Sequence, residues 1–220
     1  MPLRVSAAGE GQVVVAQIDG GKGNALDIEI VDGLLHELRG LTSTQGLVVT
    51  GCAGMFTGGL DLSTLAAGGE PADRLLAGMG RLLVGVLRSS RPVVVAADGN
   101  GVAAGAMLML AADLAIVSDR VSNYGFAEVR SGIPLPASVV TLIECRAATW
   151  ATMRLAAHGE LVGPDDAVRM GLADQVVPVE SLTDVAIVRA AELASLPAEP
   201  YATTKQLVNA DLAEAMAQAV

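Results

Sequence analysis

The stretch GLVVTGCAGMFTGGLDL, residues 46–62, decides the fold of this chain together with RPVVVAADGNGVAAGAML, residues 91–108. Each begins with a β-branched run typical of a buried parallel strand, passes through glycines and ends in a helical pattern. Glycine allows a close backbone approach, and the start of a helix carries unpaired N–H groups. Two such turns that face each other would offer two N–H donors to one oxygen, which is how an oxyanion is stabilised.

Size and composition restrict the function further. The chain has 220 residues, 52% of them hydrophobic and only 2% aromatic, so one large domain with a core of Ala, Val, Leu and Met is expected. A formal charge of −10 without any basic run argues against nucleic-acid binding. The Cys and His residues form no cluster at ligand spacing, so no metal site is expected.

The sequence also carries signals about the compartment. Two cysteines cannot build a disulfide framework, which favours a reducing cytoplasm. The first residues lack the apolar core of a signal peptide, and the apolar run at 102–117 is interrupted by Asp113 and too short to cross a bilayer. We therefore expect a soluble, cytoplasmic protein with no membrane partner.

Strand–turn–helix units recur along the chain and predict an α/β fold. Pro197 and Pro200 bracket the expected boundary between a core domain, 1–196, and a short C-terminal helical segment, 197–220. The periodicity predicts a hairpin over 3–8 and 11–18, strands over 47–50, 93–97 and 114–118, and helices over 27–40 (capped by Asp27), 71–88, 104–112, 136–157, 165–170, 181–195 and 202–216.

One stretch also supports a dinucleotide-binding alternative. Residues 99–104 match G-x-G-x-x-A after a strand, and Asp119 ends the next strand, 119 − 99 = 20 residues beyond Gly99. This interpretation is the weaker one, because it leaves the FTGGLDL turn unexplained and its helix is short for such a unit.

Five blocks follow one another in the order of a known family. They are KGNALDIEIV (22–31), GLVVTG…FTGGLDL (46–62), RPVVVAADGNGVAAGA (91–106), YGFAEVRSGIPLP (124–136) and PDDAVRMGLADQVVP (164–178). With them the chain resembles the enoyl-CoA hydratase/isomerase, or crotonase, superfamily. The resemblance implies a spiral of ββα units with a short C-terminal helical part, and homotrimers or hexamers. It also implies an acyl-CoA thioester as substrate, with coenzyme A as part of that substrate and no tightly bound cofactor.

The resemblance assigns an oxyanion hole to two backbone N–H groups, those of Leu60 and Ala104. The small residues Gly58 and Gly59 keep their family positions, whereas the usual glycine run around the second donor is here Ala103-Ala104-Gly105. Asp61, which follows the first turn, is expected to cap a helix.

Hydratases of the family use two glutamates, of which this chain keeps one. The first position is occupied by Met107, and the second matches Glu128. A single carboxylate suits a proton shuttle, as in the isomerase branch, and enclosure by Tyr124, Phe126, Ile133 and Leu135 would raise its pKa. The alternative for Glu128 is a surface residue paired with Arg130.

The remaining predicted contacts come from the same resemblance. Lys22, Ala25 and Leu26 are expected to meet the nucleotide and pantetheine, and Lys205 corresponds loosely to a region that reaches the nucleotide. Asp61, Met107 and Pro134 complete the predicted substrate contacts together with Gly58 and Gly59. The acyl pocket is expected to involve Met55, Phe56, Leu62, Leu65, Leu75, Met79 and Leu82, a spacing that also fits plain core packing.

Three functions stay open from the sequence. The leading one is double-bond isomerisation of an enoyl-CoA by Glu128. The second is a divergent enoyl-CoA hydratase, or lyase, and the third is a non-catalytic acyl-CoA binder that keeps the pocket without the chemistry.

Overall fold

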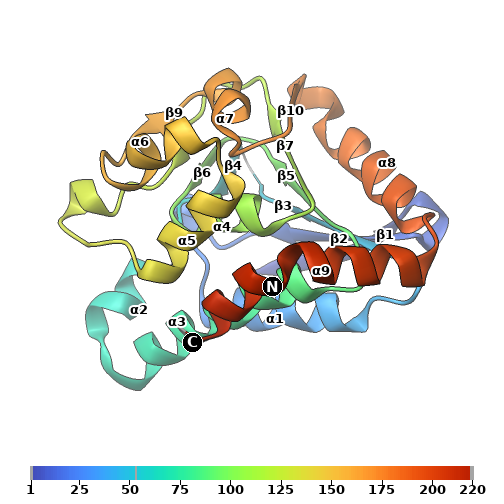
Figure 1. Cartoon of the computed structure of the whole chain (residues 1–220), viewed down its shortest axis with the longest axis horizontal. Helices are drawn as coiled ribbons and strands as arrows, with labels where there is room; N and C mark the ends of the chain where they lie inside the picture. Colours follow the sequence, from blue (N-terminus) through green and yellow to red (C-terminus); the bar gives the residue numbers. More distant parts are fainter. Residues whose placement is uncertain (1, 53, 219–220) are drawn as a thin grey trace.

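A computed structural model describes residues 2–52 and 54–218 of the chain (Figure 1). Its larger sheet has the strand order β1-β2-β3-β5-β7-β10. The first pair is antiparallel, which confirms the predicted hairpin, and the other neighbours are parallel. The strands are β1 (Leu3–Ala8), β2 (Val13–Ile18), β3 (Gly46–Thr50), β5 (Val93–Ala97), β7 (Leu114–Ser118) and β10 (Gln175–Val177).

A smaller sheet takes the second strand of each repeated unit. Its order is β4-β6-β8-β9, made of β4 (Met55–Thr57), β6 (Asn100–Val102), β8 (Tyr124–Gly125) and β9 (Leu161–Val162). The chain runs three times from a strand of the larger sheet to one of the smaller sheet and then into helix. This is the predicted spiral of ββα units.

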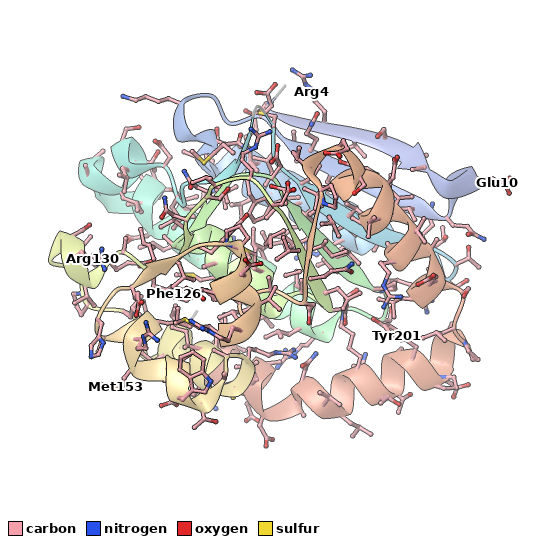
Figure 2. The ribbon with its side chains drawn as sticks, turned by 90° about the horizontal axis from the view of Figure 1, so that it is seen from above. Arg4, Glu10, Phe126, Arg130, Met153 and Tyr201 are labelled. Carbon is pink, nitrogen blue, oxygen red and sulfur yellow. The ribbon has the colours of Figure 1, made fainter. Side chains whose placement is uncertain are left out.

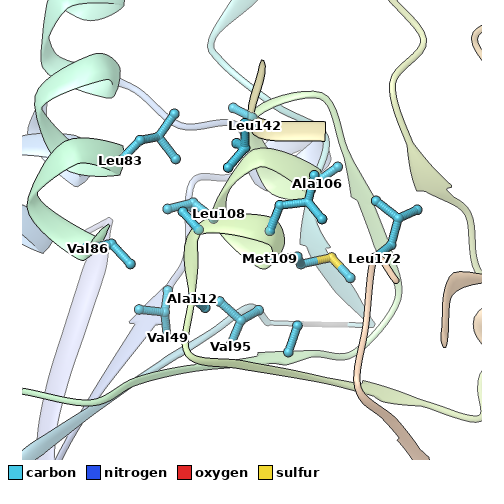
Figure 3. Close-up of a cluster of buried hydrophobic side chains, with 14 of the residues drawn as sticks. Val49, Leu83, Val86, Val95, Ala106, Leu108, Met109, Ala112, Leu142 and Leu172 are labelled. Atoms are coloured by element: carbon cyan, nitrogen blue, oxygen red, sulfur yellow. The ribbon is translucent and has the colours of Figure 1, made fainter. Parts of the chain in front are cut away.

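Helices cover both faces of the larger sheet. The helices of the described residues are α1 (Ile28–Gly40), α2 (Leu62–Ala67), α3 (Gly69–Arg88), α4 (Ala104–Ala111), α5 (Ala137–Arg146), α6 (Thr152–Ala156), α7 (Pro164–Met170), α8 (Leu182–Ala194) and α9 (Ala198–Ala217), and not all of them touch this sheet. One face packs on α8 through Leu182, Ala186 and Ala190. On the other face α4 lies in the core against strand residues Val49 and Val95 and helix residues Leu83 and Leu142 (Figure 3).

The predicted helix over 136–157 is wrong in one respect, because it is interrupted. Helix α5 ends at Arg146, and Ala147 and Ala148 are extended. The N–H of Ala148 donates to the carbonyl of Met170 at 2.9 Å, so a contact with the end of α7 replaces a helical hydrogen bond. Apolar periodicity does not report such a tertiary contact.

The C-terminal helix begins earlier than predicted, at Ala198 rather than near residue 202. Pro197 is its N-cap and Pro200 lies in its first turn, where a missing N–H costs nothing. The domain boundary at 196/197 stays a prediction, and the last two residues of the predicted C-terminal segment lie outside the described residues.

The strand crossing from the larger to the smaller sheet depends on Gly99. Its φ is +85°, and a Cβ at this position would lie 1.8 Å from the carbonyl oxygen of Gly54. Strand β6 follows directly, so residues 99–104 lead through a second strand before α4 begins. The dinucleotide-binding alternative needs a strand that turns straight into its helix, and the structure does not have that arrangement.

Candidate active site

The first predicted oxyanion turn, residues 58–61, is held against the loop before α1. The N–H of Leu26 donates to the carbonyl of Gly59 at 2.8 Å, and the carbonyl of Leu26 accepts from the N–H of Asp61 at 2.9 Å. Leu60 lies between these two bonds. Its own N–H makes no hydrogen bond within the described residues and faces away from Leu26.

The side chain of Asp61 caps the helix that follows this turn. It accepts hydrogen bonds from the backbone N–H groups of Ser63 and Thr64, which confirms the predicted cap. Hydrogen bonds from the Thr64 and Ser63 hydroxyls lower the pKa of Asp61 to about 2. The carboxylate is therefore committed to helix α2 and is unsuited to proton transfer.

The second turn begins α4 and carries the other predicted donor, Ala104. Ala103, the N-cap, has φ 54° and ψ −116°, a region that glycine adopts far more readily than alanine. The N–H of Ala104 makes no hydrogen bond among residues 2–52 and 54–218.

The two turns lie in contact with each other. A Cβ atom built on Gly59 would stand 3.1 Å from the Cβ of Ala103 and 3.7 Å from the backbone nitrogen of Ala104. Leu60, next to Gly59, and Ala104 thus present two unpaired backbone donors on adjoining turns. An arrangement of this kind can accept developing negative charge on one oxygen.

A cavity of about 290 Å³ opens beside the first of these donors, Leu60, and its lining includes neither Ala104 nor Glu128. Leu60 and Met107 both line it, so the structure brings these two predicted residues together. The rest of the wall comes from α3, α5 and the end of α9, as Asp73, Leu76, Ala77, Met79, Gly80, Leu83, Ser138, Val139 and Met216. Most of these side chains are apolar, as an acyl group requires.

Sequence reasoning identified only part of this wall. Met79 was predicted to lie in the acyl pocket and does line the cavity. Phe56, Leu75 and Leu82 are at most 2% exposed core residues, and Leu62 is 73% exposed at the start of α2. The α5 and α9 contributions carry no local signal, because they depend on how distant helices pack.

Glu128 lies three residues beyond Gly125, whose carbonyl accepts from the N–H of Ala103 at 2.9 Å. This bond ties the Glu128 loop to the second turn. The Oε2 atom of Glu128 is buried and has no hydrogen-bond partner within the described part of the chain. Burial raises the pKa of Glu128, so the carboxyl is poised nearer to neutral pH than an exposed one.

The neighbours of Glu128 differ in part from those predicted. Tyr124 and Phe126 are fully buried, whereas Ile133 is 54% exposed, so Ile133 contributes little to the enclosure. Arg130 makes no ion pair with Glu128 in the described residues, and its side chain lies against Gly159. Figure 2 shows Arg130 at the outer edge of the molecule and Phe126 further inside.

The other predicted ligand contacts fall into two groups. Lys22, Ala25, Gly58 and Pro134 have exposed or half-buried positions, as a contact with a ligand requires. The predicted ligand contacts of Leu26 and Phe56 need correction, because both side chains are fully buried. The N–H and carbonyl of Leu26 are hydrogen-bonded to the turn. Both side chains pack in the core and support the turn, so they are not open to a ligand.

The predicted contact between Lys205 and the nucleotide also needs correction. It is 7% exposed, and its Nζ donates to Asp113 Oδ2 at 2.6 Å and to the carbonyl of Arg91 at 3.1 Å. A lysine held in this way does not reach out to a nucleotide.

Sequence reasoning missed Asn24, which fixes the loop beside the first turn. Its Nδ2 donates to the carbonyl oxygens of Ile18 and Phe56, at 3.1 and 2.6 Å, and its Oδ1 accepts from the N–H of Gly20 at 2.7 Å. The signal was available as an amide residue within a glycine-rich turn, GKGNAL. Asn24 also has φ 49°, which asparagine tolerates better than most residues.

The described residues lack two further features. They contain no group of three His, Cys, Asp or Glu side chains arranged to hold a metal ion. None of their helices has the length and hydropathy needed to cross a membrane.

Fold and turns together define the class: this is a crotonase-type α/β spiral. The profile of the family described as enoyl-CoA hydratase/isomerase matches residues 9–220. The chain belongs to the enoyl-CoA hydratase/isomerase family, and it is an enzyme of that type.

Three relatives illustrate the match. A Thermus thermophilus protein named putative enoyl-CoA hydratase is 32% identical over 84% of this chain and 75% of its own length. The human protein named enoyl-CoA delta isomerase 1, mitochondrial, is 28% identical over 84% of this chain and 63% of its own. The crystal structure of an enoyl-CoA hydratase/isomerase family protein from Pseudomonas syringae superposes with a TM-score of 0.93 at 27% identity, covering 99% of this chain and 94% of that one.

Proposed function

We propose that this enzyme isomerises the double bond of a 3-enoyl-CoA thioester, with Glu128 as the only proton carrier. The observation that carries the proposal is the contrast between Glu128 and Met107, the two family positions for a catalytic acid; Asp73 also lies on the cavity wall but is exposed. Glu128 offers one buried, unpartnered carboxyl oxygen, whereas Met107, on the cavity wall beside Leu60, offers none.

The reaction needs one base and one place for negative charge. The Glu128 carboxylate removes a proton from the α carbon, and the electrons of that C–H bond move into the thioester, whose oxygen becomes an enolate. The N–H groups of Leu60 and Ala104 donate to this oxygen. Glu128 then returns the same proton to the γ carbon, which leaves the double bond conjugated with the thioester and consumes no other reactant.

The acyl chain lies in the 290 Å³ cavity between α3, α5 and α9, and coenzyme A lies toward Lys22 and Ala25. Coenzyme A is part of the substrate in this proposal and not a resident cofactor. The assembly as a homotrimer or hexamer stays a prediction.

The test is turnover of a 3-enoyl-CoA, followed by the absorbance of the conjugated product. Glu128→Gln keeps the size of the side chain and removes its base, so we expect turnover to fall by about 10²-fold or more. Glu144→Gln is the matched control, since Glu144 is exposed on α5. Equal turnover by the wild type and Glu128→Gln would refute the assignment.

An enoyl-CoA hydratase is the second candidate, favoured by the name of the Thermus thermophilus relative. Hydration needs a group that activates water, and methionine at position 107 does not do so. We therefore expect water addition to a 2-enoyl-CoA to be slow beside isomerisation. A faster hydration rate would reverse the order of the two candidates, and coenzyme A binding without either reaction would identify a non-catalytic binder.

A further inference from the structure

A second cavity, of about 460 Å³, lies between the first turns of α9, the end of α5 and the residue before β7. It shares no lining residue with the cavity at Leu60 and Met107. The chemistry proposed for Glu128 makes no use of it. Figure 2 places Tyr201, one of its lining residues, at the start of α9.

The cavity carries an uncompensated positive charge. The Asp113 carboxylate accepts from Lys205 Nζ at 2.6 Å and from the N–H of Val93 at 2.7 Å, so Lys205 and Asp113 neutralise each other. Arg146 is the second cation of the wall. Its Nη2 donates to the neutral Asn209 side chain at 2.5 Å, and it pairs with no carboxylate in the described residues.

Two polar atoms at this cavity are buried without a hydrogen-bond partner among the described residues. They are Nε of Arg146 and the hydroxyl of Tyr201. Burial and the nearby Asp113 carboxylate raise the pKa of Tyr201, so its hydroxyl keeps a proton to donate. A buried donor left unpaired costs free energy that an acceptor would recover.

Apart from Thr204, the remaining wall is apolar. Leu196, Pro197, Pro200 and Val208 line it, and Val208 is 72% exposed at its mouth. A ligand that suits both parts has an anionic acceptor at one end and a hydrocarbon tail at the other.

We propose that this cavity binds an organic monocarboxylate with an apolar tail. The carboxylate accepts hydrogen bonds from Arg146 Nε and the Tyr201 hydroxyl, and the tail covers Pro197, Pro200 and Val208. Both donors lie just beneath the cavity surface, so binding includes a rotation of these two side chains toward the ligand.

Isothermal titration of the full chain with octanoate tests the proposal, with octanol as the uncharged probe of the same tail. We expect octanoate to bind more tightly than octanol. Tyr201→Phe removes one donor to a charged acceptor and should weaken octanoate by about tenfold or more while leaving octanol unchanged. Equal affinity of the wild type and Tyr201→Phe for octanoate would overturn the proposal.

A pair of surface variants locates the site without disturbing the core. Val208→Asp adds a negative charge at the mouth and should weaken octanoate. Leu207→Asp, one residue away and 74% exposed, does not line the cavity and should leave the affinity unchanged. Weakening by both variants to the same extent would contradict a site at this mouth.

Two further results would also overturn the proposal. Ala77→Leu narrows the other cavity, so loss of octanoate binding in this variant would place the ligand there. A change in the molecular mass of Val208→Asp in solution, without a change in octanoate affinity, would show that this face contacts a second copy of the chain. We expect neither result. Octanoate binding at this cavity does not depend on Glu128, so its failure would leave the proposed isomerisation unaffected.

Discussion

The side-chain amide of Asn24 donates a hydrogen bond of 2.6 Å to the backbone carbonyl of Phe56, in the strand that leads into the first predicted oxyanion turn. A second bond runs to the carbonyl of Ile18, at the end of β2. One buried amide thus joins the larger sheet to the smaller one beside the turn. Its loss should disturb the position of Leu60 as well as the stability.

We expect Asn24→Ala to lower the free energy of unfolding by about 2–4 kcal/mol, because it leaves buried carbonyl groups without donors. Thermal unfolding measures this loss. Gln45→Ala is the matched control: its amide also bonds backbone groups, those of Gly11 and Thr42, but at an exposed site. The control should change the free energy by only about 0.5 kcal/mol. Equal losses of unfolding free energy in both variants would show that the buried hydrogen bonds of Asn24 contribute no more than exposed ones.

The contact between the two turns gives a second prediction, on Gly59. Gly59→Ala places a methyl group 3.1 Å from Ala103 Cβ and 3.7 Å from the nitrogen of Ala104, where the thioester oxygen must approach. We expect kcat for 3-enoyl-CoA to fall by about 10²-fold, as on loss of one oxyanion donor. Steady-state kinetics measure this change.

Gly69→Ala separates this steric effect from backbone strain. Gly69 also has a positive φ, of +66°, but a Cβ there meets nothing within 4 Å. This variant should lose stability to a similar degree and keep its kcat. If Gly69→Ala lost activity as severely as Gly59→Ala, strain alone would account for both.

Much of this fold could be predicted from local signals. The runs at 93–97 and 114–118 became β5 and β7 with the predicted bounds, and Asp27 caps α1 by accepting from the N–H of Ile30 at 2.8 Å. Each of these elements is specified by its own apolar pattern or cap.

The short strands of the smaller sheet were not predicted, because their signal is not local. Strand β8 has two residues, Tyr124 and Gly125, and exists because β6 and β9 lie on either side of it. For the same reason Met216, 216 − 125 = 91 residues beyond the end of β8, could not be placed on the cavity wall from sequence. Glu128 and the two turns were found through a family pattern, and the unpartnered state of Glu128 Oε2 needed the structure.

The conformation of Ala103 gives a third prediction. A φ of 54° with ψ −116° is strained for an L residue with a Cβ, and such strain costs about 1–3 kcal/mol. Ala103→Gly should therefore raise the melting temperature. Ala104→Gly makes the same chemical change one residue later, inside α4, and should lower the melting temperature, since glycine is unfavourable there. Shifts of the melting temperature with the same sign in both variants would contradict the inference that the backbone of Ala103 is strained.

A fourth prediction concerns the pH dependence set by Glu128. Burial raises its pKa in the folded state above the value of about 4.3 in the unfolded chain, so protonation favours folding. That stability is fully present below the unfolded pKa and is lost as the pH rises through the folded pKa. Glu128→Gln should unfold at a higher temperature than the wild type at pH 7 and at the same temperature below about pH 4. Because the carboxyl is only half-buried, solvent screening keeps the difference below about 1 kcal/mol.

The reaction rate should depend on the same carboxyl with the opposite sign: it should rise with pH where the stability falls. Proton removal requires the carboxylate, so kcat/KM for 3-enoyl-CoA should fall as the pH drops through the raised pKa of Glu128. A wild-type profile that falls only below the ordinary pKa of a glutamate, together with identical melting temperatures of the wild type and Glu128→Gln at pH 7, would rule out a raised pKa.

The last prediction restores the carboxylate that the family pattern places at position 107. Met107 is half-buried on the cavity wall beside Leu60, three residues after the predicted donor Ala104. Met107→Glu adds a group that can activate water, so we expect hydration of 2-enoyl-CoA to rise by about tenfold or more above the wild type. Met107→Gln has nearly the same size without the acid and should show no gain. We expect the double variant Met107→Glu/Glu128→Gln to lose this gain in hydration. A double variant that hydrates as fast as Met107→Glu would show that Glu128 takes no part in hydration.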